Sequence, residues 1–249
     1  MKNLKVTIAY NGSAYNGYQS QPNGNTVQDQ LQKSISVLLN QPITVNGCSR
    51  TDAGVHARQF IFNALYDDGL SSIAPDSFVR AMNGSLPNDI AVISCEYAPL
   101  EFHARFCAKG KEYLYLVDTS KVRNVFSTDL ALHYPHEIDV PKLRDAASLI
   151  IGKHDFAAFC KAEAKEHLKS TVRTVTGIKI EKNQELVEFY VNGDGFLHNM
   201  VRIIVGTLIY VNENKRSKEE VREALETGNR EKAGKTLPPH GLYLNKVFY

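Results

Sequence analysis

The sequence predicts an α+β protein built from two successive β-α-β-β-α-β halves. Short segments alternate apolar and polar residues, as half-buried strands do. Between them lie segments whose apolar residues recur every three or four positions, as on the buried face of a helix. The same order of elements is found twice along the 249 residues. That length suffices for one large or two small domains.

The first half shows each of its elements in turn. "LKVTIAY" at 4–10 alternates and is predicted as a strand. Asn25 or Thr26 can cap the next segment, a helix marked by Val27, Leu31 and Ile35. Two strands, a short helix and a strand are predicted to follow, at 43–47, 59–66, 76–87 and 90–97.

The second half repeats this order with one extra helix. "KEYLYLVD" is predicted as a strand, and "VPKLRDAASLIIG" as a helix. "TVTGIKI" and "LVEFYVNG" form a predicted hairpin across "EKNQE". The remaining predicted elements are an apolar helix, a charged helix and a closing strand, at 197–210, 217–226 and 241–249.

Two such halves in succession indicate a duplicated, ferredoxin-like architecture. We place the boundary near Arg105, so the expected domains are residues 1–104 and 105–249. This kind of sheet binds RNA in some proteins and is a plain scaffold in others. Function must therefore be sought in particular residues.

Composition excludes several classes of protein. The 29 Lys and Arg residues nearly balance the 27 Asp and Glu, so bulk charge indicates no polyanionic partner. No apolar run reaches the ~18 residues of a membrane span, and no secretory signal is apparent. The four cysteines lack metal-type spacing. We expect a cytoplasmic protein with free thiols, no metal site and no membrane partner.

The loop "GCSRTDAGVHARQF", directly after a predicted strand, holds several charged or potentially reactive side chains. Arg50 and Arg58 bracket Asp52, and Gly54 permits a turn that a side chain would obstruct. Guanidinium groups favour the ionised carboxylate and also match phosphate. An anionic nucleophile beside phosphate binders suggests a nucleotide substrate. The alternative is a plain hairpin whose aspartate caps backbone amides.

Several motifs together resemble the TruA family of tRNA pseudouridine synthases. They run in family order as "YNGYQSQP", "TVQDQL", "RTDAGVHA", "FHARFCAKGKEYLY", "FLHNMVRIIVGTLI" and "GLYLNKVFY". The resemblance implies two ferredoxin-like halves forming one continuous antiparallel sheet, with helices packed on one face and an active-site cleft between the halves. This agrees with the repeated order of elements.

The resemblance also implies roles for individual residues. Asp52 looks like the catalytic aspartate, with Arg50 two positions before it. Tyr113 is similar to the tyrosine that stacks on the target uracil, and Arg202 resembles the basic residue that pairs with the aspartate. Spacing alone would instead favour Tyr113 as an ordinary strand-packing residue and Arg202 as a snorkelling side chain on an apolar helix. Lys111 stands where arginine is commoner in the family.

The implied reaction turns uridine into pseudouridine in the anticodon stem-loop, at tRNA positions 38, 39 and 40. It needs no cofactor, because nothing is oxidised and no group leaves. The resemblance further implies a homodimer acting on tRNA.

Basic residues are candidate RNA contacts. Arg58, Lys109 and Lys111 lie in or beside the motifs, and three further lysines, with Arg173, recur every fourth residue: Lys161, Lys165 and Lys169. If that segment is helical, the row aligns as a phosphate track, although such rows are usually solvated faces.

Two other classes remain open. A non-catalytic RNA-binding module would not need Arg50, Asp52, Tyr113 and Arg202 together, whereas a differently targeted paralogue would keep them and differ in the tRNA it prefers. A glycosidic hydrolase would be expected to carry a second carboxylate, whereas the loop offers only Asp52.

Overall fold

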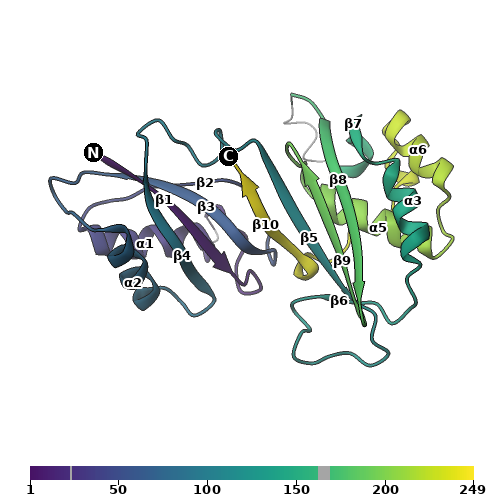
Figure 1. Cartoon of the computed structure of the whole chain (residues 1–249), viewed down its shortest axis with the longest axis horizontal. Coiled ribbons are helices and arrows are strands. Elements are labelled where there is room, and N and C mark those ends of the chain that lie inside the picture. The colour runs from purple at the N-terminus through teal and green to yellow at the C-terminus, as the bar shows by residue number, and fades with distance from the viewer. Residues whose placement is uncertain (23, 162–168) are drawn as a thin grey trace. The chain divides into compact units, whose positions relative to one another are not determined.

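The computed structural model describes residues 1–22, 24–161 and 169–249 (Figure 1). They form two compact units, one of Met1–Lys109 with Tyr243–Tyr249 and one of Gly110–Leu242. Both units contain strands and helices, so the predicted α+β class is confirmed. None of the described helices has the length and apolar character needed to span a membrane.

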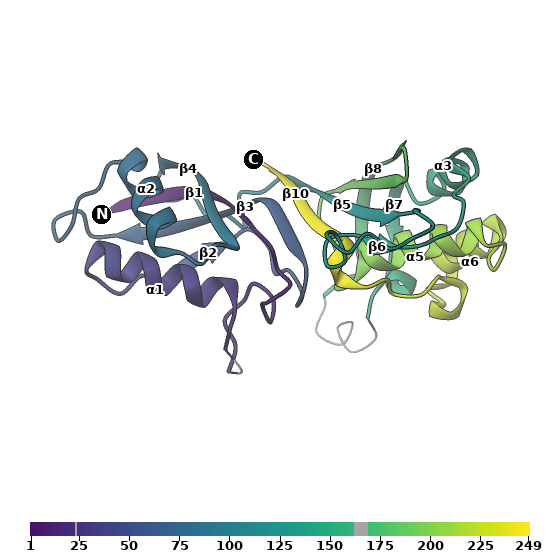
Figure 2. The ribbon, with the colours of Figure 1, turned by 90° about the horizontal axis from the view of Figure 1, so that it is seen from below.

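The first unit contains the predicted β-α-β-β-α-β order and one strand from the end of the chain. Its elements are β1 (Lys2–Tyr10), α1 (Val27–Leu39), β2 (Val45–Gly47), β3 (His56–Tyr66), α2 (Pro75–Ser85), β4 (Ile90–Ala98) and β10 (Leu242–Phe248). Seen from below, α1 runs along one side of the strands of this unit (Figure 2). Helix α2 packs against β4 and also touches α1.

Strand β3 has different partners along its length. It pairs antiparallel with β1, and β1 pairs antiparallel with β4. On its other side β3 pairs with two strands in turn: His56 and Ala57 lie opposite β10 in a parallel pairing, and Phe62 to Ala64 lie opposite β2. The pairing is thus mixed rather than wholly antiparallel. The result is that β10 lies beside the start of β3.

The local sequence accounts for these elements. Leu4, Val6 and Ile8 on alternate positions of β1 are fully buried, as its pattern predicted. Thr26 is the cap of α1, and its side chain accepts a hydrogen bond from the Asp29 N–H. Helix α1 ends at Asn40, which adopts the left-handed conformation common at helix ends.

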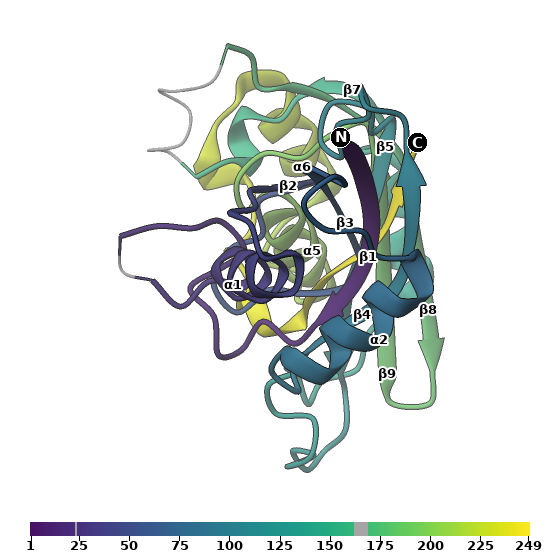
Figure 3. The same cartoon turned by 90° about the vertical axis from the view of Figure 1, so that its left-hand side faces the viewer.

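The second unit is built around an antiparallel order β5-β9-β8-β7, to which β6 adds a parallel pairing with β5. Its elements are β5 (Gly110–Asp118), β6 (Leu132–His133), α3 (Val140–Ser148), β7 (Gly152–Asp155), β8 (Val172–Asn183), β9 (Leu186–Gly193), α5 (Met200–Asn212) and α6 (Lys218–Thr227), with short 3-10 turns at 157–159, 230–232 and 239–241. Figure 3 shows the β8–β9 hairpin that "EKNQE" was predicted to close.

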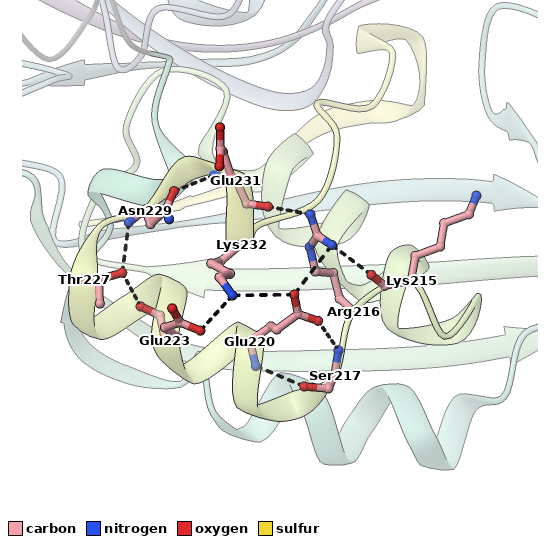
Figure 4. A network of polar contacts seen from close by, with 9 residues as sticks. All are labelled: Lys215, Arg216, Ser217, Glu220, Glu223, Thr227, Asn229, Glu231 and Lys232. Atoms are coloured by element: carbon pink, nitrogen blue, oxygen red, sulfur yellow. Dashed lines mark hydrogen bonds and ion pairs between the residues drawn. The ribbon is translucent and has the colours of Figure 1, made fainter.

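Two helices of this unit differ in what holds them. Helix α5 is apolar on nearly every side and buried, and Gly206 lets it approach the chain closely at Lys235. Helix α6 begins with a capping box between Ser217 and Glu220. Around it lies a network of ion pairs and side-chain hydrogen bonds (Figure 4).

Candidate active site

The segment between β2 and β3 carries Asp52 on a tight turn. Asp52 is partly exposed, whereas Thr51 before it is buried. The Val55 N–H donates to the Asp52 carbonyl at 3.1 Å, which closes the turn. Gly54 has a φ of 75°, in the left-handed region that glycine adopts without strain. The aspartate therefore sits on a defined turn at the start of β3.

A second segment, residues 11–18 after β1, clamps this turn through backbone hydrogen bonds. The Tyr18 N–H donates to the Thr51 carbonyl at 3.1 Å, and the Gly54 N–H donates to the Tyr15 carbonyl at 3.4 Å. The hydroxyls of Tyr10 and Thr51 share a hydrogen bond of 2.8 Å. Thr51 and Gly54, on either side of Asp52 in the turn, are thus tied to residues 15–18, and Thr51 is tied to Tyr10 as well.

Glycines make this close approach possible. A Cβ on Gly12 would lie 2.0 Å from the Val55 carbonyl oxygen, and one on Gly17 would lie 2.7 Å from the Thr51 carbonyl oxygen. Gly17 also has a positive φ of 91°. Since backbone atoms on the other side cannot rotate away, neither position admits a side chain without moving the turn.

The start of β3 carries an aromatic stack that sequence reasoning missed. The His56 and Tyr243 rings stack at 4.6 Å, and Arg58 lies over the Tyr243 ring at 5.3 Å. Nδ1 of His56 accepts from the Gly12 N–H at 3.0 Å, so the ring is fixed on the clamp as well. Burial raises the pKa of Tyr243 to about 12, against the opposing effect of Arg58. Arg50 and Arg58 are both exposed.

In the second unit, Tyr113 lies in β5 opposite Val191 and is only 7% exposed. Its ring meets Phe196 edge-on at a centroid distance of 5.2 Å. Phe196 belongs to the motif "FLHNMVR", so two of the predicted motifs meet here. The ring is held by strand and aromatic packing.

Arg202, on the first turns of α5, is held by two hydrogen bonds. Its Nε donates to the Leu237 carbonyl at 2.6 Å, and its terminal nitrogen donates to Oδ1 of Asn199 at 2.7 Å. Burial lowers the pKa of His240, and the charge of Arg202 lowers it further, while Asp129 opposes the shift. Asn199 and His240 were not predicted as site residues; Asn199 stands in "LHNMVR", beside the residues that were.

The lysines are exposed or partly exposed where described. Lys109 is exposed, and its N–H donates to the Phe248 carbonyl at 2.8 Å. Lys111 is partly exposed, and Lys161 and Lys169 are exposed. Lys165 lies outside the described residues. Lys169 lies in a bend and Arg173 in β8, so the idea that one helix aligns these two residues is wrong.

The candidate residues fall into two groups. Arg50, Asp52 and Arg58 belong to the first unit, whereas Tyr113 and Arg202 belong to the second. Among the residues that the structure describes, no cluster of histidine, cysteine and carboxylate side chains could hold a metal ion. The four cysteines, all among the described residues, are not joined in disulfides; Cys48 and Cys160 are buried, and Cys107 is exposed.

Comparison with known proteins identifies the family. The family model described as tRNA pseudouridine synthase matches residues 6–107 and 146–249. "tRNA pseudouridine synthase A 2" of Clostridium perfringens is 39% identical over 249 residues, covering 100% of both chains. "tRNA pseudouridine synthase A" of Geobacillus sp. is 42% identical, covering 100% of this chain and 98% of its own.

Among solved structures, one titled "Crystal Structure of a Cbf5-Nop10-Gar1 Complex" aligns with 97% of this chain and 48% of its own, at 10% identity and a TM-score of 0.42. That likeness is too distant to add to the argument. The family model and the full-length relatives are sufficient: the chain belongs to the TruA family of tRNA pseudouridine synthases, which are isomerases.

Proposed function

We propose that Asp52 is the catalytic carboxylate and that the enzyme converts uridines on the 3′ side of the tRNA anticodon stem-loop, at positions 38, 39 and 40. The observation that carries the catalytic assignment is the clamped turn: a partly exposed carboxylate stands where Gly12 and Gly17 permit close backbone contact. A fixed geometry of this kind is what positioning a reactive group requires.

The reaction has three parts. The N1–C1′ bond of uridine breaks, the uracil turns, and C5 bonds to C1′ while the proton on C5 is lost and N1 gains one. A carboxylate can add to C1′, remove a ribose proton or stabilise positive charge at the sugar. Each of these roles needs an oxygen of Asp52 close to C1′.

The other candidates complete the proposal. A base inside a helix is out of reach, so the target uridine must leave its stack. We assign its stacking partner to Tyr113, whose ring is held by Phe196. Arg202 would orient Asp52 through charge, and Arg50, Arg58, Lys109 and Lys111 would contact phosphates. Each of the expected halves, 1–104 and 105–249, would thus contribute residues to the reaction.

The test is to incubate an unmodified tRNA transcript with the enzyme and map each pseudouridine. We expect the modification only at positions 38, 39 and 40, and none when a transcript carries cytidine at those positions. Modification at another uridine would assign the protein to a differently targeted paralogue. Release of free uracil would make it a hydrolase.

Assembly is the second part of the proposal. We propose a homodimer, as the family resemblance implies, with both subunits acting on one tRNA. Sedimentation should give a mass of two chains for the enzyme alone and of two chains plus one tRNA for the complex. A single chain bound to each tRNA would contradict it.

A further inference from the structure

The turn from His103 to Cys107 presents a large aromatic side chain to solvent. Phe106 is 77% exposed, in a unit whose other phenylalanines are mostly buried. The His103 ring lies against it with centroids 4.4 Å apart, and the Arg105 guanidinium lies 6.0 Å from its centroid. Single exposed apolar side chains are common on protein surfaces, but this one lies beside a histidine ring and an arginine.

Local hydrogen bonds keep this turn in one conformation. The Cys107 N–H donates to the His103 carbonyl at 3.0 Å, and the Arg105 N–H donates to Nδ1 of His103 at 3.1 Å. The imidazole is therefore fixed beside the phenylalanine ring. The aromatic pair is presented in a set orientation and needs little ordering to bind.

A buried polar pedestal holds the turn against the sheet. Asn3 and Asn63 are both 1% exposed, and Nδ2 of Asn63 donates to Oδ1 of Asn3 at 3.1 Å. Oδ1 of Asn63 accepts from the Ala104 N–H at 2.9 Å. Nδ2 of Asn3 donates to the carbonyls of Pro99 and Phe102, at 2.9 and 3.0 Å.

The pedestal has no evident use except to position this turn. Apolar side chains could fill two buried positions of neighbouring strands without any desolvation cost, and asparagine is disfavoured in strands. Apart from the hydrogen bond between the two asparagines, those just described lead to the backbone of Pro99, Phe102 and Ala104. A further one, at 2.7 Å, is donated to the Ala104 carbonyl by the hydroxyl of Tyr249.

The turn lies on the same face of the first unit's strands as Arg58. Ala57 pairs with Tyr10 and Phe60 with Ile8, and all four are buried on one face. The register shifts between these two pairs, so Ala57 and Phe60 share a face although they are three residues apart. Alternation from Ala57 to Arg58, and from Phe60 to Asn63, then places Arg58 and Asn63 on the opposite face. From His56 to Asn63 the strand rises about 23 Å, at roughly 3.3 Å per residue.

The sequence on either side of Phe106 is basic. Between Glu101 and Glu112 the chain carries Arg105, Lys109 and Lys111 with no acidic residue among them, and His103 lies in the same segment. Arginine and histidine beside an aromatic ring are the groups that hold an unpaired base and its phosphates. A second copy of this chain, with a net charge of +2, offers no general electrostatic complement.

We propose that Phe106, with His103 and Arg105, is a stacking platform for an unpaired base of the bound tRNA. The stacked base is a second nucleotide, separate from the uridine being isomerised, since the platform lies far along β3 from the turn that carries Asp52. The proposal rests on tRNA as the substrate and not on which uridine is modified.

The test compares Phe106→Ala, Phe106→Tyr and Phe126→Ala in single-turnover assays over a range of tRNA concentrations. Phe126 is the matched control, since it is 92% exposed and follows an arginine three residues earlier in "RNVF". We expect Phe106→Ala to raise the Kd for tRNA about 5- to 150-fold, with a smaller loss of rate at saturation. Phe106→Tyr should restore wild-type affinity within about threefold, and Phe126→Ala should bind as wild type.

Three results would overturn the proposal. The first is a wild-type Kd for tRNA in Phe106→Ala. The second is an equal loss of tRNA affinity in Phe106→Tyr and Phe106→Ala. The third is a loss of tRNA affinity in Phe126→Ala as large as that in Phe106→Ala. Sedimentation of the same variants identifies a surface between protein copies, because Phe106→Ala would then change the mass of the assembly. None of these outcomes depends on the position of the modified uridine, so the platform and the stem-loop assignment fail separately.

Discussion

The two units hold their candidate site residues by different means. In the first, Asp52 stands on an irregular turn whose backbone is clamped to residues 11–18. In the second, Tyr113 and Arg202 stand on a regular strand and helix, and side-chain contacts fix them. The first arrangement depends on glycines and the second on hydrogen bonds and ring packing. Substitutions that leave Asp52 in place can therefore break each arrangement separately.

The largest effect is expected from Gly12→Ala. Its Cβ would lie 2.0 Å from the Val55 carbonyl oxygen, so the backbone of one segment must move. We expect a loss of about 3 kcal/mol in the free energy of unfolding. We also expect a fall of about 100-fold in the single-turnover rate at saturating tRNA, since displacement of the turn misplaces Asp52.

Gly84→Ala is the matched control, because nothing lies within 4 Å of its Cβ position in α2. It should leave the rate unchanged and stabilise the protein slightly. Urea unfolding and rate measurements on both variants check the comparison. If Gly12→Ala keeps the wild-type free energy of unfolding and the wild-type rate, the contact between residues 11–18 and the turn does not position Asp52.

A smaller but still large effect is expected from Arg202→Ala. If Arg202 orients Asp52, the single-turnover rate at saturation should fall about 10- to 100-fold, by more than the affinity for tRNA. Arg144→Ala is the control, since Arg144 also donates to a backbone carbonyl, that of Ile180. An unchanged saturated rate with a raised Kd would reassign Arg202 to phosphate binding.

A modest effect is expected from the hydroxyl pair of the clamp. Thr51→Val removes the 2.8 Å hydrogen bond to Tyr10 and should reduce the free energy of unfolding by about 1 kcal/mol. Tyr10→Phe should cost a similar amount, and the double variant less than the sum of the two. Full additivity of the unfolding free energies would mean that the pair is not coupled.

The smallest effect is expected from the lysine row. Replacing Lys161, Lys165 and Lys169 by glutamine should make the plot of log affinity for tRNA against log salt concentration less steep. The slope should fall by up to about three phosphate contacts, at roughly 0.7 to 0.9 per contact. Affinity for one tRNA is measured across a salt series. If wild type and variant give parallel lines of equal height, the row is a solvated face.

Much of the fold follows from local pattern. Alternation predicted β1, β5 and β9, helical spacing predicted α1 and α6, and Thr26 was among the expected caps. The short strand β7 was missed because "GKHD" has no apolar alternation, and the helix predicted for 140–152 ends at Ser148. Which strands pair with one another was harder to predict. One edge of β3 pairs with β10 near its start and with β2 further along, and the contact with β10 joins segments that are distant in the sequence.

The candidate residues could be selected from the sequence, but the contacts that support them could not. The motif containing Asp52 could be found in the sequence, as could Gly54 and the motif that contains Gly17. What each glycine touches could not, because Gly12 meets Val55 only in the folded chain. The stack of His56 on Tyr243 joins residues that are far apart in the sequence, and no local pattern indicates it.

The central claim is that the Asp52 carboxylate performs the chemistry, and Asp52→Asn tests it most directly by keeping the size and removing the charge. In a single-turnover reaction at saturating tRNA, we predict that pseudouridine formation falls by about 10⁴-fold or more. The Kd for tRNA and the free energy of unfolding should stay near their wild-type values. A variant that binds tRNA and forms pseudouridine at the wild-type rate would contradict the account.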